Sequence, residues 1–162
     1  MKKAIIFFSI IIFFVGCYSF TGGSVPEHLE TLYIAPVEDV SGFGDPQFRI
    51  LLNEEMIRNF EDDASFVLVN RNGDARIEAV IKRIVEEPVE LSAGELETER
   101  KITVSIEVAY NDLVKKNLIW EKSFSNFEVF EIANAQTARN EALGVAIEQT
   151  ALDILFAVVS GW

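Results

Sequence analysis

The stretch ERKITVSIEVAYN, residues 99–111, decides the fold because its apolar and polar side chains alternate strictly. Successive side chains of a β-strand point to opposite faces of the sheet. One face would carry Ile102, Val104, Ile106, Val108 and Tyr110, and the other Thr103, Ser105, Glu107, Ala109 and Asn111. The stretch therefore predicts a strand with one face in the core and the other in solvent.

Two stretches beside it predict antiparallel neighbours for this strand. Residues 76–87 change the parity of their apolar side chains near Lys82-Arg83, which predicts either a β-bulge there or a strand that is apolar on both faces. Residues 113–117 predict a tight reversal, after which residues 118–127 resume the alternation. Short reversals of this kind join antiparallel strands.

The first half of the chain predicts a strand, a helix and a short second strand. Residues 31–37 are nearly continuously apolar, as in a strand that is covered on both faces. Asp45-Pro46 predicts a helix start, because aspartate caps helices and proline is accepted at the first helical position. Apolar side chains then recur at three- and four-residue steps over residues 46–60, and residues 65–69 form the second strand. A helix between two strands predicts a right-handed crossover between parallel neighbours.

The last element is predicted to be a helix that begins at Asn134 and ends at Gly161. One of its faces would carry the apolar residues Leu143, Ile147, Ala151, Ile154 and Val158. The fold class is therefore α+β, with two amphipathic helices packed on one face of a four- to five-stranded mixed sheet. The order is strand-helix-strand-strand-strand-strand-helix, in a single domain over residues 31–162.

Residues 1–16 have the pattern of a signal peptide. Lys2 and Lys3 precede an apolar run, residues 4–15, that is interrupted only by a serine. A helix needs about 20 apolar residues to cross a bilayer, so this run is too short for a permanent span. The sequence predicts that it is cleaved from the mature protein.

Cys17, the single cysteine, is the predicted lipidation site. Gly16 stands directly before it, and a small residue before a lone cysteine is typical of bacterial lipoprotein precursors, although Phe14 replaces the commonest leucine. Acyl chains such as palmitate on Cys17 would anchor the protein, and Tyr18 in place of aspartate favours the outer membrane over the inner one. Residues 17–30 are predicted to be a tether. A soluble secreted form and an uncleaved anchor remain open alternatives.

Composition argues against several functions. The chain carries 14 Lys+Arg against 26 Asp+Glu, and its net charge is −12. Loss of Lys2 and Lys3 would leave 12 basic residues and a net charge near −14, which argues against binding nucleic acid. With His28 as the single histidine, and Cys17 committed to lipid, the chain lacks a Ser-His-Asp triad, a Cys-His pair or a His/Cys zinc site. We expect no enzymatic activity, metal or cofactor.

Basic pairs in this acidic chain are the remaining candidate contacts. Lys115-Lys116 lies at the predicted hairpin tip, and Lys82-Arg83 and Arg100-Lys101 lie on neighbouring strands. Lysines at sheet edges commonly deter aggregation between strands. The alternative is that Lys115 and Lys116 bind phosphorylated sugar head groups. The aromatic residues Phe43, Phe127 and Phe130 are further candidate anchors for a partner.

Five short motifs, taken in order, resemble the LPS-assembly lipoprotein family LptE. They are CYSFTGG at 17–23, LYIAPV at 32–37, SGFGDP at 41–46, TERKITV at 98–104 and IWEK at 119–122. The resemblance implies an outer-membrane lipoprotein with two helices on a four-stranded sheet. It also implies that the domain plugs the β-barrel of LptD and assists lipopolysaccharide transport, with lipopolysaccharide as a further candidate ligand. The strongly acidic charge departs from the basic surfaces of better-known members.

Other classes of function share the same beginning. Residues 32–37, followed by a Ser-Gly loop and a helix, also resemble lipoprotein activators of peptidoglycan synthases and curli-secretion lipoproteins. Such proteins bind soluble enzymes or assemble into pores. A third hypothesis is an anchored structural domain without a dedicated ligand.

Overall fold

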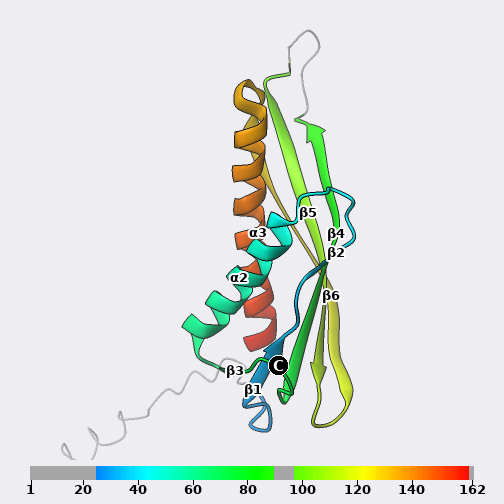
Figure 1. The fold of residues 1–162 in the computed structure, drawn as a ribbon, viewed down its shortest axis with the longest axis vertical. Coiled ribbons are helices and arrows are strands. Elements are labelled where there is room, and N and C mark those ends of the chain that lie inside the picture. Colours follow the sequence, from blue (N-terminus) through cyan, green and yellow to red (C-terminus); the bar gives the residue numbers. More distant parts are fainter. Residues whose placement is uncertain (1–24, 90–96, 161–162) are drawn as a thin grey trace, which may run out of the picture.

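The computed structural model describes residues 25–89 and 97–160 (Figure 1). The predicted signal peptide, Cys17 and Gly161 lie outside the described residues. The elements in chain order are β1 (Thr31–Ile34), β2 (Glu38–Asp39), α2 (Gln47–Asp63), β3 (Val67–Leu68), β4 (Ala75–Pro88), β5 (Glu99–Asp112), β6 (Asn117–Glu131), the 3-10 turn η2 (Ile132–Asn134) and α3 (Ala135–Val159). The predicted α+β class is confirmed.

The sheet is mixed, as predicted, and its strands follow the order β3-β1-β4-β5-β6. β1 runs parallel to β3 and to β4, whereas β4, β5 and β6 form an antiparallel meander. Figure 1 shows both helices on the same side of this elongated sheet. The two-residue strand β2 adds a pairing to β4 at a place where the sequence predicted only a loop.

The predicted β-bulge lies in β4, where the register with β5 shifts between Ile81 and Arg83. The shift moves Ile84 to the parity that faces the helices, beside the core. A second shift, between Tyr110 and Asn111 of β5, was not predicted. The alternation of side chains within β5 continues regularly up to Asn111, so it gives no sign of this shift. The irregularity lies in the pairing of β5 with β6.

One face of β5 forms the centre of the core. Its five predicted apolar side chains are all 0% exposed: Ile102, Val104, Ile106, Val108 and Tyr110. α3 packs on this face and on β6, and α2 packs against α3. The five α3 residues predicted to share one face are buried there too: Leu143, Ile147, Ala151, Ile154 and Val158. The alternation in residues 99–111 thus placed the core correctly.

The helix α2 begins close to its predicted start. The Gln47 backbone N–H donates to Asp45 Oδ1 at 3.0 Å, and Pro46 already has helical dihedral angles. This is the contact that an aspartate cap makes. α2 ends at Asp63, and the next residue, Ala64, caps the helix in a left-handed conformation with φ of 56°. Its buried side chains include Phe48, Leu52, Met56 and Phe60.

α3 is the more apolar helix. In length and hydropathy it is the one helix among the described residues that is fit to cross a membrane, with a mean hydropathy of 1.7 over its most apolar window. Half of that window is buried inside the domain. A long apolar helix that packs on a sheet is an ordinary core helix. The apolar composition of α3 is therefore explained by its packing in the core.

The folded part begins before Thr31. Leu29 is 2% exposed and belongs to the core, and Val25 packs against it. The Leu29 backbone N–H donates to the Pro26 carbonyl, which closes a turn. Residues 25–30 therefore lie on the domain, although the sequence assigned them to the tether.

Candidate functional site

The two ends of the sheet differ in chemistry, and we name them by their residues. The hairpin end comprises residues 25–31, 72–75 and 112–118, where the chain enters the fold and β5 turns into β6. The far end comprises residues 85–88, 99–103 and 127–131.

A buried carboxylate organises the hairpin end. Asp112, the last residue of β5, is 3% exposed, and its Oδ2 lies 2.7 Å from Nε2 of His28. Its Oδ1 accepts the Lys115 backbone N–H at 2.7 Å. Asp112 thereby joins the entering chain to the β5–β6 turn. No sequence signal linked His28 to Asp112, because they are 84 residues apart.

A second aspartate fixes the start of β1. Asp74 Oδ2 accepts the Thr31 backbone N–H at 3.0 Å and the Thr31 hydroxyl at 2.7 Å. In return, the Asp74 backbone N–H donates to Thr31 Oγ1 at 2.8 Å. The Leu113 backbone N–H donates to the Asp74 carbonyl at 2.7 Å, so the network extends to the turn. No local pattern in the sequence links Asp74 to Thr31, because they are 43 residues apart.

Both carboxylates are held in their charged form. Burial acts to raise the pKa of Asp112, but hydrogen bonds from His28 and from the Lys115 backbone outweigh it, and the pKa lies below its ordinary value. The hydrogen bond from the Thr31 hydroxyl lowers the pKa of Asp74. The hydrogen bonds of Asp112 and Asp74 form a network that stabilises this end of the structure.

The predicted head-group ligands, Lys115 and Lys116, lie at the tip of the hairpin end. Both are exposed, and Lys116 adopts a left-handed conformation with φ of 57°. The side chains of three apolar neighbours are also exposed: Leu113 at 39%, Val114 at 54% and Leu118 at 51%. The tip therefore combines two cations with an apolar surface.

The other predicted basic pairs lie among carboxylates. Lys82 pairs with Glu107 at 3.5 Å and Lys101 with Glu87 at 2.7 Å. Arg100 contacts Glu86 at 2.8 Å and also Glu97. The hydrogen bond from Lys101 lowers the pKa of Glu87, and the hydrogen bond to Glu86 raises the pKa of Arg100. Lys82, Lys101 and their partners lie on the solvent face of the sheet, whereas Arg100 and Glu86 have the parity that faces the helices. In each pair the charges neutralise one another, which makes these cations poor ligands for an added anion.

The three candidate aromatic anchors differ in accessibility. Phe130 is 5% exposed and part of the core, so its selection as a surface anchor was wrong. Phe43 packs edge-on against Phe48 and lies under Arg139, whose guanidinium carbon is 5.4 Å from the ring centroid. Phe127 is 56% exposed, with Lys101 Nζ 5.5 Å from its ring centroid. Among the three, Phe127 is the accessible one.

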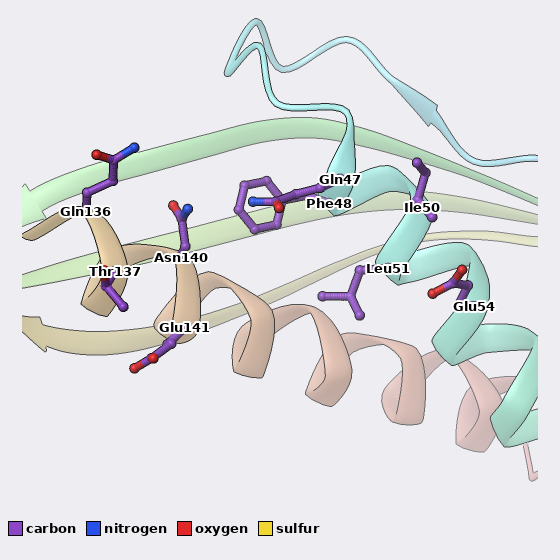
Figure 2. Close-up of a pocket in the computed structure, with 9 residues that line it drawn as sticks. All are labelled: Gln47, Phe48, Ile50, Leu51, Glu54, Gln136, Thr137, Asn140 and Glu141. Atoms are coloured by element: carbon purple, nitrogen blue, oxygen red, sulfur yellow. The ribbon is translucent and has the colours of Figure 1, made fainter.

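A cleft of about 670 Å³ opens between the first turns of the two helices (Figure 2). Phe48, Ile50 and Leu51 of α2 form its apolar side, while Asn140 stands on the facing side in α3. Its other lining residues are polar: Gln47, Glu54, Gln136, Thr137 and Glu141. No pattern in the sequence predicts this cleft, because its two walls are almost 90 residues apart in the chain. Within residues 25–89 and 97–160, no group of three or more His, Cys, Asp and Glu side chains could hold a metal ion.

The fold, an open mixed sheet with two helices on one face, is shared with solved bacterial proteins of low sequence identity. A protein from Xanthomonas campestris has a TM-score of 0.61 at 13% identity, over 85% of this chain and 91% of that one. Uncharacterized lipoprotein B from Nitrosomonas europaea has a TM-score of 0.58 at 16% identity, over 85% and 86% of the two chains. The PelC dodecamer from Paraburkholderia phytofirmans has a TM-score of 0.56 at 7% identity, over 87% and 94%. No curated protein matches the sequence.

The fold thus defines the class as an α+β domain of a kind found in bacterial lipoproteins. The family is set by sequence: residues 29–158 match the family described as LptE, lipopolysaccharide-assembly, and the chain belongs to this family. This confirms the predicted family, and four of the five short motifs lie within the matched residues, the motif at 17–23 lying outside them. Membership places the protein among non-enzymatic lipoproteins of the bacterial cell envelope that serve lipopolysaccharide assembly. The absence of catalysis in this particular chain stays a prediction.

Proposed function

We propose that this protein is an outer-membrane lipoprotein that plugs and partners an LptD-like β-barrel, and so assists lipopolysaccharide transport to the outer leaflet. The observation that carries the proposal is the family match over residues 29–158. The exposed apolar positions on the helices, Ile50, Leu152 and Phe156, give such a barrel apolar side chains to contact. The acidic charge favours a complementary basic surface on the partner.

The anchor in this proposal is the acylated Cys17, on the periplasmic face of the outer membrane. Several acyl chains on one residue bind a membrane stably, whereas a single chain is marginal. The variant Cys17→Ser should release the protein from membranes and abolish its labelling by palmitate. Unaltered labelling of Cys17→Ser would refute the assignment of the lipidation site.

The partner is tested by photo-crosslinking from outer membranes. A crosslinker at Ile50, which lines the helix cleft and is 51% exposed, reports on the helix layer. The matched site is Ser123, which is exposed and pairs with Glu107 on the solvent face of the sheet. We expect one large β-barrel at equal stoichiometry from at least one of the two sites.

Other products decide against the proposal. Recovery of a peptidoglycan synthase, or of a homo-oligomeric ring of this chain, would support an activator or a secretion-accessory lipoprotein instead. Unchanged surface lipopolysaccharide after depletion of the protein would indicate a structural domain without a role in transport.

A further inference from the structure

The tip of the hairpin end, residues 113–118, carries an amphipathic surface that is exposed and not packed in the core. Leu113, Val114 and Leu118 are 39%, 54% and 51% exposed. Lys115 and Lys116 lie between them in the turn. An apolar surface beside lysines is the composition of segments that lie in the interface of a bilayer, where the lysines reach lipid phosphates.

The chain enters the fold beside this tip. His28 contacts Asp112 at 2.7 Å, and the Leu113 backbone N–H donates to the Asp74 carbonyl at 2.7 Å. Figure 1 shows the start of the described chain and the β5–β6 turn at the same end of the molecule. Val25, the first described residue, is eight positions after Cys17. Eight residues span at most about 28 Å, so a membrane-held Cys17 keeps this end near the bilayer.

We propose that residues 113–118 rest on the phospholipid bilayer that holds the acylated Cys17, with the three apolar side chains at the boundary between head groups and acyl chains. This inference rests on the acylation of Cys17 in the proposed function. For the lipoprotein outside the barrel, it assigns an orientation to the domain: the hairpin end faces the membrane and the far end points away from it. Lys115 and Lys116 then contact phospholipid phosphates rather than a bound lipopolysaccharide.

Because the tether holds the domain near the bilayer, a small contact between residues 113–118 and the lipid is sufficient for binding. Three exposed apolar side chains would bind a bilayer weakly on their own, but a short link converts the contact into an intramolecular one at high effective concentration. Charge has a smaller part, because Glu27 and Glu30 are exposed at the same end and offset the two lysines. The contact should therefore depend mainly on apolar burial and weakly on salt.

The far end provides a matched control. Phe127 is 56% exposed, against 54% for Val114, and pairs with Thr103 of β5. Thr103 is nine residues from Asp112 along the strand, which corresponds to about 30 Å. The two residues are thus similarly exposed, and they lie at opposite ends of the sheet, Phe127 within β6 and Val114 in the turn.

The test uses the acylated full-length protein in phospholipid vesicles. Acylation blocks Cys17, so Val114→Cys or Phe127→Cys supplies the one free thiol for a nitroxide spin label. Accessibility of the label to oxygen, which concentrates in lipid, and to a water-soluble nickel complex is measured for each variant. We expect the label at 114 to be at least fivefold less accessible to nickel than the label at 127, with the reverse order for oxygen.

Equal aqueous accessibility at 114 and 127, with the acyl mass on Cys17 intact, would overturn the inference. The assignment of Cys17 as the lipid anchor would still hold. Loss of the acyl mass would instead refute the anchor. In a second arm, Leu113→Asp with Val114→Asp should make a label at Leu118→Cys about tenfold more accessible to nickel. Protection of position 114 only in vesicles that contain lipopolysaccharide would overturn the phospholipid contact in favour of lipopolysaccharide as the ligand of the tip.

Discussion

The hairpin end and the far end of the sheet are both rich in charge, but they use it differently. At the hairpin end, Asp112 is 3% exposed and bonds His28 and a backbone N–H. At the far end, Arg100 and Lys101 pair with carboxylates while their side chains are 38% and 36% exposed. Water screens exposed pairs, whereas a buried charge depends on its protein partners. The difference indicates that the hairpin end fixes the entering chain, while the far end carries pairs of small energetic weight.

The largest expected effect concerns the backbone of the hairpin end. A Cβ added at Gly73 would lie 2.8 Å from the Ala75 carbonyl oxygen and 2.8 Å from the Tyr33 backbone nitrogen. Because backbone atoms on both sides would have to move, Gly73→Ala should lower the free energy of unfolding by about 3 kcal/mol. Urea denaturation measures this value.

The matched control is Gly144→Ala in α3. Its Cβ would meet only Leu51 Cδ2, at 3.8 Å, which is ordinary contact. Alanine favours a helix over glycine, so this variant should be unchanged or more stable by up to about 1 kcal/mol. A loss below 1 kcal/mol for Gly73→Ala would show that the β1–β4 junction yields easily.

The second effect separates buried from exposed charge. Asp112→Ala leaves the Lys115 N–H and the His28 ring without their acceptor, so the free energy of unfolding should fall by about 2 kcal/mol. Hydrogen exchange of the residue 25–31 amides should accelerate along with this loss. Protection that persists in this segment would mean that Leu29 alone holds the chain entry.

The third effect is a dependence on pH. The pKa of Asp112 and the pKa of Asp74 lie below the ordinary value of 3.8, so the unfolded state binds more protons than the folded state near and below that pH. Their contribution is fully present above the ordinary pKa and is lost as pH falls through the lower, folded-state values. Stability should therefore decline from about pH 4.5 downward.

The variant Asp112→Asn tests whether the hairpin end or the far end causes the dependence of stability on pH. It should make the acid slope of stability shallower between about pH 4.5 and 2, as followed by thermal unfolding. Glu87→Gln at the far end removes a carboxylate whose pKa Lys101 lowers, but that carboxylate is exposed, so its slope should change less. Equal changes in the two variants would contradict the distinction between the ends.

The smallest effect is expected from Arg100→Ala. This variant removes the contacts with Glu86 and Glu97, which are partly open to solvent. The free energy of unfolding should fall by less than about 1 kcal/mol, and the difference should shrink further in high salt. A loss comparable to that of Asp112→Ala would show that the far end is also structurally essential.

Much of the fold could be predicted from local patterns. Alternation over residues 99–111 gave the core face of β5. The change of parity at Lys82-Arg83 indicated a bulge or a strand apolar on both faces, and the structure has the bulge. The capping signal at Asp45-Pro46 gave the start of α2. Each of these features depends on neighbours in sequence, so the residue pattern alone specifies them.

The sites depended on contacts between distant segments. Phe130 belongs to the apolar parity of β6, but its burial required the helix layer to be in place. The helix cleft joins α2 to the start of α3, which no local pattern connects. Lys115 and Lys116 were correctly placed in a turn, whereas their position beside the chain entry is a property of the assembled sheet.

By itself, the sequence determined the α+β class, the antiparallel meander, the two core helices and membership of the LptE family, because periodicity and short motifs are encoded locally. Only the tertiary structure decided that His28 meets Asp112, that Asp74 holds Thr31, and that the hairpin tip lies beside the chain entry. These are pairings across 43 and 84 residues. They form because packing of the apolar core brings the polar ends of the strands together, and the carboxylates of Asp112 and Asp74 then accept hydrogen bonds from the donors within reach.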